Sequence, residues 1–376
     1  MKDFSNKKIV LCKKCMMPSS RPRITFNSSG ICNGCINSMK KRKLNWKKRK
    51  DEFLRMIEKV KKKKCIYDCI VPWSGGKDSS AIAYKLKFQF GLNPLLVTFS
   101  PMIPTDVGLH NREEMLKLGF DHIFVRPNQR VARYLANRFF IERGNPKIAW
   151  DAGINVAPIS TAIQLNIPMI FYAEHGESEY GGYIQSKQHQ KIRDFSEFLE
   201  HQVGDDPRNW VDENVNENEL YPYIYPDTVK IKKIGIKIMY FSYFFYWDIF
   251  DNYKLIKNKI NFKLAPNGRT DGTFSGYDSI DDKIDNLYYY MQFIKFGFGR
   301  CVRDCARLIQ LGYLDIKKAK NQIKQYDGEF PNTYLKDVLE YLSLNNKQLN
   351  SIIDKHRNSE VWFKGKNGWQ LRQKLV

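Results

Sequence analysis

The chain has 376 residues, of which 43% are hydrophobic, 14% aromatic and 27% charged. This length exceeds that of one typical domain, and the composition excludes a wholly disordered or collagen-like protein. The formal net charge of +22 is concentrated at the start, because residues 1–64 hold 21 Lys and Arg against 4 Asp and Glu, a balance of +17. A basic N-terminal segment therefore precedes a nearly balanced body.

The first residues, MKDFSNKKIVLCKKC, lack the apolar core of a secretory signal. The most membrane-like stretch, residues 234–250, is short and contains Lys237 and Asp248, so a buried strand followed by a loop is predicted there. We therefore expect a cytoplasmic protein that does not associate with membranes. In that compartment, eight cysteines favour metal or redox chemistry over disulfides.

Two CxxC pairs lie close to the N-terminus, and they consist of Cys12, Cys15, Cys32 and Cys35. Their spacing is typical of a zinc ribbon with four thiolate ligands. A module of about forty residues cannot bury enough surface to fold alone, so a bound metal would supply the missing free energy. We predict structural Zn²⁺ in residues 1–40, with redox-active pairs as the alternative.

The other four cysteines give weaker signals. Cys65 and Cys69 lie on a predicted strand and are expected in the core. Cys301 and Cys305 are four residues apart on a predicted helix, where a role in sulfur transfer stays open.

The chain then divides into three further segments. Residues 41–64 place four apolar residues among charges, which indicates a basic surface helix or linker. Strands are predicted at 65–73, 94–100, 121–127 and 167–176, and helices at 80–91, 108–119 and 129–144. This alternation predicts an α/β fold with a doubly wound parallel sheet over residues 65–262, interrupted by a polar insertion or lid at 184–232. Residues 263–376 are predicted to be mostly helical, with one helix that begins at Ser279 as its N-cap.

The sharpest motif is SGGKDS, between a predicted strand and a predicted helix. It consists of Ser74, Gly75, Gly76, Lys77, Asp78 and Ser79. The glycines let the backbone approach an anion closely, and the first amides of the helix point at that anion. The serines add hydroxyl donors, the lysine adds a positive charge, and the aspartate suits Mg²⁺ held by phosphates. An ordinary Gly-Gly turn with a serine cap is the alternative.

This motif resembles the SGGxDS signature of the PP-loop ATP pyrophosphatases. Members of that superfamily cleave ATP between the α- and β-phosphates and activate a carbonyl oxygen as its adenylate, which a nitrogen or sulfur nucleophile then displaces. The resemblance implies that residues 74–79 bind the pyrophosphate of ATP and that Asp78 binds Mg²⁺. It also implies that the end of the second strand, at Val97, Thr98 and Phe99, lies near the adenine.

Further motifs extend the resemblance over nearly the whole chain. They are CxxCxxP at 12–18, GxCxxC at 30–35, HGESEYGGY at 175–183, YFFYWD at 243–248, SIDDKIDNL at 279–287, IKFGFGR at 294–300 and YDGEFP at 326–331. Together they resemble the N-acetyl sugar amidotransferases of pseudaminic-acid and lipopolysaccharide sugar biosynthesis. The resemblance implies an enzyme that converts the acetamido group of a sugar into an acetamidino group.

The resemblance also implies roles for individual residues. Glu177, Glu179 or Asp304 would orient ammonia or accept its proton, and the sequence does not choose among them. Residues expected to contact the sugar acceptor are Tyr180, Gly181, Gly182, Asp281, Asp282, Lys295 and Arg300. In the subfamily, IKFGFGR continues as Thr/Ser-Asp-Asp, whereas this chain continues as CVRD and retains only the acid at position 304.

The source of the ammonia is predicted from what the sequence lacks. Residue 2 is Lys, so a glutaminase with an N-terminal cysteine is excluded, and no G-x-C-x-G elbow is present. We therefore expect a separate glutaminase partner and a cyclase-like ammonia-channel subunit. The alternative function is that of a tRNA-modifying PP-loop enzyme of the thiolase type, which the basic N-terminal segment favours. The abundance of Lys throughout the chain and the nearly neutral body argue against a nucleic-acid substrate.

Overall fold

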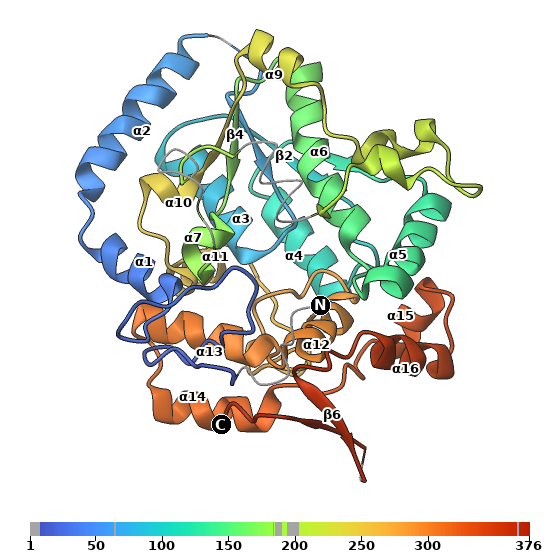
Figure 1. Ribbon diagram of the computed structural model, residues 1–376. Helices are drawn as coiled ribbons and strands as arrows, with labels where there is room; N and C mark the ends of the chain where they lie inside the picture. The colour runs from blue at the N-terminus through green and yellow to red at the C-terminus, as the bar shows by residue number, and fades with distance from the viewer. Residues whose placement is uncertain (1–7, 64, 183, 185–189, 194–202, 367) are drawn as a thin grey trace.

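A parallel five-stranded sheet lies at the centre of the computed structural model, which describes residues 8–63, 65–182, 184, 190–193, 203–366 and 368–376 (Figure 1). The strands are β1 (Cys69–Pro72), β2 (Pro94–Phe99), β3 (His122–Val125), β4 (Met169–Tyr172) and β5 (Lys237–Tyr240). All neighbouring pairs run parallel in the order β3-β2-β1-β4-β5. The predicted α/β class with a parallel sheet is confirmed.

The strand order reverses at β1, which pairs with both β2 and β4. Open parallel sheets bind ligands at such a switch point, outside the carboxyl ends of the strands. The SGGKDS motif directly follows β1, and the acidic HGESEY segment follows β4. The topology therefore brings the two motifs to one edge of the sheet.

Helices cover both faces of the sheet, because successive strand residues alternate between two cores. Ile70 packs in one core and Val71 in the other. The connecting helices are α3 (Lys77–Tyr84), which continues as a π-helix η1 (Lys85–Gln89), and α4 (Asp106–Leu116), α5 (Gln129–Arg143) and α6 (Ile148–Gln164). No element is predicted from the sequence where α6 lies. That helix is apolar nearly all round and contains Pro158, so it lacks an amphipathic stripe.

Two N-terminal helices, α1 (Asn33–Arg42) and α2 (Trp46–Lys61), precede the sheet, and α2 flanks it on the side opposite α5 and α6 (Figure 1). The helix predicted within 41–64 is present, but its apolar face reaches the core. Phe53 is fully buried, with ring centroids 4.9–5.8 Å from those of five other phenylalanines. The N-terminal segment is thus packed into the core of the α/β domain.

Substituting Phe53 by Ala should lower the free energy of unfolding by about 3–5 kcal/mol, because it leaves a large cavity among those rings. Urea denaturation followed by circular dichroism would measure the change. Phe363→Ala on the exposed hairpin is the matched control and should cost less than about 1 kcal/mol. Equal losses for the two variants would contradict the core position of α2.

Residues 263–376 are mostly helical, as predicted, but end in a hairpin that is not predicted from the sequence, and several short helices before residue 263 are not predicted either. The remaining elements are α7 (Gly176–Tyr180), η3 (Pro207–Trp210), η4 (Glu217–Tyr223), α9 (Thr228–Ile234), α10 (Phe241–Phe244), α11 (Ile249–Lys257), α12 (Asp285–Phe296), α13 (Arg300–Leu311), α14 (Ile316–Tyr326), α15 (Leu335–Tyr341), α16 (Asn346–Lys355), β6 (Trp362–Gly365) and β7 (Gly368–Leu371). The strand predicted within 234–250 is confirmed as β5, and α10 replaces the predicted loop. Of the predicted insertion at 184–232, residues 185–189 and 194–202 lie outside the described residues, and the described part contains η3, η4 and the start of α9 and packs Trp210 and Leu220 into the core. Among the helices that the structure describes, none combines the length and the apolar character needed to cross a bilayer.

The prediction that Ser279 caps a helix is wrong, because α12 begins at Asp285. Ser279 has a backbone φ of +48° and lies in an irregular crossing segment. The carboxylate of Asp282 accepts hydrogen bonds from the amides of Met102 (2.7 Å) and Ile103 (3.0 Å), near the end of β2. Asp282, one of the acids that suggested a helix start, therefore makes a tertiary contact that holds this segment against the residues after β2.

Candidate active site

The SGGKDS motif forms a tight loop between β1 and α3. Gly75 has a φ of +93°, and a Cβ there would lie 2.3 Å from Cγ of Arg112, so the position requires glycine. Ser74 Oγ accepts a hydrogen bond from the Gly76 amide (3.2 Å), which stabilises the turn. Because α3 begins immediately afterwards, its first amides are available to an anion in front of the loop.

Two residues of the loop, Lys77 and Asp78, form an ion pair with each other, and each also binds a side chain from outside the loop. The Lys77 ammonium is buried and pairs with Asp78 (2.6 Å) and Asp278. Burial opposes its charge, but the two carboxylates outweigh burial and raise the pKa of Lys77 above its usual value. Asp78 also accepts a hydrogen bond from the side-chain amide of Asn252 (2.9 Å). The loop therefore keeps a charged lysine and a fixed carboxylate beside the anion position.

A cavity of about 250 Å³ opens beside this loop. Its charged lining residues are Asp78, Glu174, Asp278, Asp304, Arg300, Arg303 and Arg307. Acidic and basic groups from β4, α3 and α13 thus meet in one small space. Such a constellation, outside the carboxyl ends of β1 and β4, defines a candidate active site.

The three arginines lie on one face of α13, since their spacing of three and four residues matches the helical repeat. Asp327 accepts hydrogen bonds from the amides of Gly299 (2.8 Å) and Val302 (3.1 Å), which fixes the start of this helix. Arg300 is only 2% exposed, and its Nε contacts Asp304 (3.2 Å). Neither of its terminal nitrogens has a hydrogen-bond partner among the described residues. Because burying unpaired guanidinium nitrogens is costly, a ligand with anionic oxygens is expected there.

Glu174, two residues after β4, is the carboxylate that faces Asp78 across the cavity. Burial, assisted by the charge of Asp78, raises the pKa of Glu174 to about 7. Its side chain accepts a hydrogen bond from the Tyr180 hydroxyl (3.3 Å). Glu174 is not among the residues predicted from the sequence. Its position just beyond the end of a central strand is the signal that distinguishes it.

The structure does not bring Glu177 and Glu179 into this cavity. Glu177 forms a two-pronged contact with Arg23 (2.6 and 3.1 Å). Glu179 is 3% exposed and pairs with Lys41 and with Arg307 (2.7 Å). Since Arg23 and Lys41 belong to the N-terminal segment, both glutamates join that segment to the α/β domain.

Gly181 and Gly182 serve the same junction. A Cβ on Gly181 would lie 2.8 Å from the amide nitrogen of Gly34, inside the second CxxC turn. A Cβ on Gly182 would lie 1.6 Å from the Glu177 carboxylate, and its carbonyl accepts a hydrogen bond from Asn33 (2.8 Å). The glycine pair therefore permits close approach of the cysteine module. Tyr183, the last residue of the motif, lies outside the described residues.

The four cysteines predicted as metal ligands come together, with every sulfur within 4.8 Å of the others. The sulfurs of Cys12 and Cys35 are 3.9 Å apart, and those of Cys15 and Cys32 are 3.6 Å apart. A tetrahedral ion with metal–sulfur bonds of about 2.3 Å requires separations of about 3.8 Å. The buried thiols therefore fit one metal ion, and Gln310 of α13 lies 3.8 Å from two of them.

The remaining predicted residues lie around the candidate site. Val97, Thr98 and Phe99 are buried at the end of β2, where Thr98 bonds to His122 (2.8 Å) and Phe99 lines a separate cavity of about 20 Å³. None of these three residues lines the 250 Å³ cavity. Asp281 is beside the phosphate loop, where burial and the charge of Asp285 raise its pKa.

Lys295 lies on α12, and its ammonium donates a hydrogen bond to the carbonyl of Arg143. It lines a second cavity together with Tyr180. Lys295 is therefore separate from the 250 Å³ cavity, whereas Tyr180 lines both.

Three comparisons bear on this site. Residues 271–376, which include Arg300 and Asp304, match the family model described as the C-terminal domain of WbpG-like LPS biosynthesis proteins. An uncharacterized protein of Methanocaldococcus jannaschii, MJ1599, is 37% identical over 87 residues, which is 23% of this chain and 31% of that protein. This chain thus matches less than a third of that relative. A solved structure, the U34-tRNA thiolase NcsA from Methanococcus maripaludis with its [4Fe-4S] cluster, is 13% identical, with coverage of 87% of this chain and 94% of that chain. Its TM-score is 0.27, too low to carry an argument about this protein.

Proposed function

We propose that the protein is an ATP-dependent enzyme that forms AMP and pyrophosphate and converts the acetamido group of a sugar into an acetamidino group. The observation that carries this proposal is that one cavity is lined both by Asp78 of the SGGKDS loop and by Arg300, whose two terminal nitrogens lack hydrogen-bond partners among the described residues. The similarity of residues 271–376 to a domain of LPS biosynthesis proteins supports a sugar acceptor.

The chemistry follows from the poor reactivity of amides. An acetamido carbon resists attack because its nitrogen donates electrons into the carbonyl group. In the proposed reaction the amide oxygen attacks the α-phosphorus of ATP and pyrophosphate departs. Ammonia then adds to the activated carbon and loses a proton, and AMP departs with the former carbonyl oxygen. The product is an amidine.

The loop and the residues that line the cavity fit these steps. The loop amides, Lys77 and Arg300 would stabilise the charge of the departing pyrophosphate. Mg²⁺ in proteins is usually held by one or two carboxylates together with phosphate oxygens, and Asp78 is the loop carboxylate that lines this cavity. When bound, this ion would neutralise phosphate charge. Asp304 lies between Arg300 and Arg303, so it would orient those guanidiniums toward the phosphates.

We further propose that the four-cysteine site binds structural Zn²⁺. Four thiolates complete a tetrahedral shell and leave no position for water or substrate. Sulfurs only 3.6 and 3.9 Å apart suit a single ion, because a cluster of several iron atoms would hold its ligands further apart. Measuring the metal content of protein purified without added metal would test this assignment.

The ammonia is proposed to come from a separate glutaminase, delivered through a cyclase-like channel subunit. Copurification with a glutaminase would support this arrangement. Full activity of the purified chain alone with glutamine in place of ammonium would refute it.

The experiment that tests the proposed reaction combines the purified chain with ATP, Mg²⁺, ammonium and a panel of acetamido sugars. Chromatography should detect AMP that depends on the sugar. Mass spectrometry should show a product one mass unit lighter than the sugar, because NH replaces oxygen. ADP as the nucleotide product with every acceptor would contradict the proposal.

The alternative, a tRNA-modifying enzyme, is favoured by the charge of residues 1–64. Tight, salt-sensitive binding of tRNA would support it. Cys301 and Cys305, the pair with an open role in sulfur transfer, are buried with their sulfurs 4.0 Å apart and do not line the candidate cavity. Their position therefore favours the sugar amidotransferase.

Glu174 is proposed to accept the proton that ammonia loses as the amidine forms. With a pKa of about 7, its carboxyl is protonated at pH 6 and ionised at pH 8, so the rate should rise between these values. The rate is to be measured at a constant concentration of unprotonated ammonia, so that only titration of the enzyme is observed. Glu174→Gln should remove this rise and lower the turnover number by about 10²–10⁴-fold.

The control for this variant is Glu213→Gln, which removes an exposed carboxylate that does not line the cavity. It should leave both the turnover number and the pH profile unchanged. An unchanged pH profile in Glu174→Gln would exclude Glu174 as the proton acceptor.

A further inference from the structure

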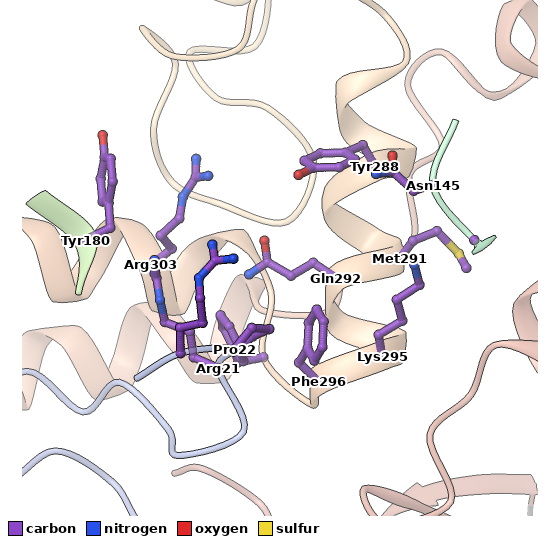
Figure 2. A pocket seen from close by; sticks show the side chains of 13 residues that line it. Arg21, Pro22, Asn145, Tyr180, Tyr288, Met291, Gln292, Lys295, Phe296 and Arg303 are labelled. Atoms are coloured by element: carbon purple, nitrogen blue, oxygen red, sulfur yellow. The ribbon is translucent and has the colours of Figure 1, made fainter. Parts of the chain in front are cut away.

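A second cavity, of about 350 Å³, adjoins the 250 Å³ cavity of the candidate active site and shares Tyr180 and Arg303 with it. In Figure 2, Tyr180 and Arg303 lie on one side of this space and Tyr288, Met291 and Lys295 on the other. Arg21, from the segment between the two CxxC pairs, lies below them. This cavity is therefore enclosed jointly by α12, α13 and the cysteine module. Its volume suits a ligand of the size of a sugar.

The charged side chains that line this cavity are all basic, since no Asp or Glu is among the described residues that line it. Arg23 is neutralised by Glu177, and Arg303 lies beside Asp304. Among the described residues, no carboxylate forms a salt bridge with Arg21 or Lys295, although Glu177 acts on Arg21 from a greater distance. Arg21 Nε is buried and lacks a hydrogen-bond partner among the described residues, and the Lys295 ammonium donates a hydrogen bond to the Arg143 carbonyl.

These two cations are held in an environment that disfavours their charge. Burial lowers the pKa of Arg21 below its usual value and that of Lys295 to about 8. A ligand anion between them would restore the lost stabilisation through charge-assisted hydrogen bonds. Apolar groups of Met291 and Phe296 provide the remaining surface.

We infer that this cavity is the acceptor site, and that Arg21 and Lys295 bind an anionic group, a carboxylate or a phosphate, on an acetamido sugar. The inference rests on the proposed function and extends it. The acetamido group then lies toward Tyr180, which separates the two cavities, and meets the nucleotide beside Asp78. The cysteine module would thus contribute directly to acceptor recognition through Arg21.

The test measures binding of three sugars to the full chain by isothermal titration calorimetry. The sugars are N-acetylglucosamine, N-acetylglucosamine 1-phosphate and 2-acetamido-2-deoxyglucuronic acid, which share a ring and differ in charge. At least one anionic sugar should bind about tenfold more tightly than the neutral one, since its anion gains hydrogen bonds to two cations. Whichever anionic sugar gains more identifies the group as phosphate or carboxylate.

Arg21→Met and Lys295→Met should each remove most of this tenfold advantage. Arg126→Met and Lys347→Met remove exposed charges elsewhere and should retain it. Equal affinity for all three sugars, or an advantage that survives both cavity substitutions, would overturn the inference.

Measuring binding and AMP formation separately distinguishes a failure of this inference from a failure of the proposed function. Anion-selective binding through Arg21 and Lys295 without AMP formation from any acceptor would refute the reaction and leave an anionic sugar site. AMP formation with no preference for an anionic acceptor would refute the acceptor site and leave the reaction.

Discussion

Asp78→Asn is expected to lower AMP formation by at least about 10³-fold, since it removes the charge that would hold Mg²⁺ at the phosphates. The asparagine side chain has nearly the same shape as aspartate. Its oxygen can still accept the hydrogen bond from Asn252, so the loop between β1 and α3 should keep its conformation. Turnover would be measured as AMP released with ammonium as the nitrogen donor.

The same preparation would be checked by thermal unfolding, where Asp78→Asn should shift the midpoint by only a few degrees. Glu213→Gln, which removes an exposed acid, is the control for loss of one negative charge. Wild-type AMP formation in the Asp78 variant would exclude this residue as the metal ligand. It would also remove the main support for phosphate chemistry at the loop.

Local sequence signals predict the sheet and the phosphate loop well. The apolar run ending at Pro72, the two glycines and the helix-forming residues that follow are contiguous, so strand, turn and helix can be inferred without knowledge of the rest of the chain. The four-cysteine site can be predicted equally well, because two CxxC pairs indicate a metal site through their spacing alone.

The choice among acids could not be made in this way. Glu174, Glu177 and Glu179 stand within six residues of one another in an acidic segment. Which of them faces the cavity depends on Arg23 and Lys41, which are 154 and 138 residues away from their partners in the chain. Such tertiary contacts produce no periodic or local pattern in the sequence from which they could be predicted.

The same reason explains the wrong helix start at Ser279. A serine followed by acids is typical of an N-terminal cap, but the carboxylate of Asp282 binds the amide of Met102, 180 residues earlier. The burial of Phe53 likewise depends on distant aromatic residues. The amphipathic pattern of α2 reveals its apolar face and not the depth to which that face is covered.

Removal of the metal from the four-cysteine site is the second change that we expect to lower AMP formation strongly. In the double variant Cys12→Ser/Cys32→Ser, the cysteine module loses two ligands and the binding free energy that folds it, which is about 10–16 kcal/mol for structural zinc in small modules. Its cysteines and Met16 pack against Val302 of α13 in one buried cluster. We expect the module to become sensitive to proteolysis within residues 8–35, while circular dichroism still shows the α/β domain.

Unfolding of the module should also disturb the candidate active site. Arg23 of the module binds Glu177, and the cysteines of the module contact Gln310 of α13. AMP formation should fall by about 10²-fold or more, and the KM for the acceptor should rise more than that for ATP. Cys65→Ser, at a half-buried cysteine outside the module, is the control and should retain both metal and activity. Full activity in a metal-free double variant would show that catalysis does not require the folded cysteine module. The contacts of Arg23 and Gln310 would then have a structural role alone.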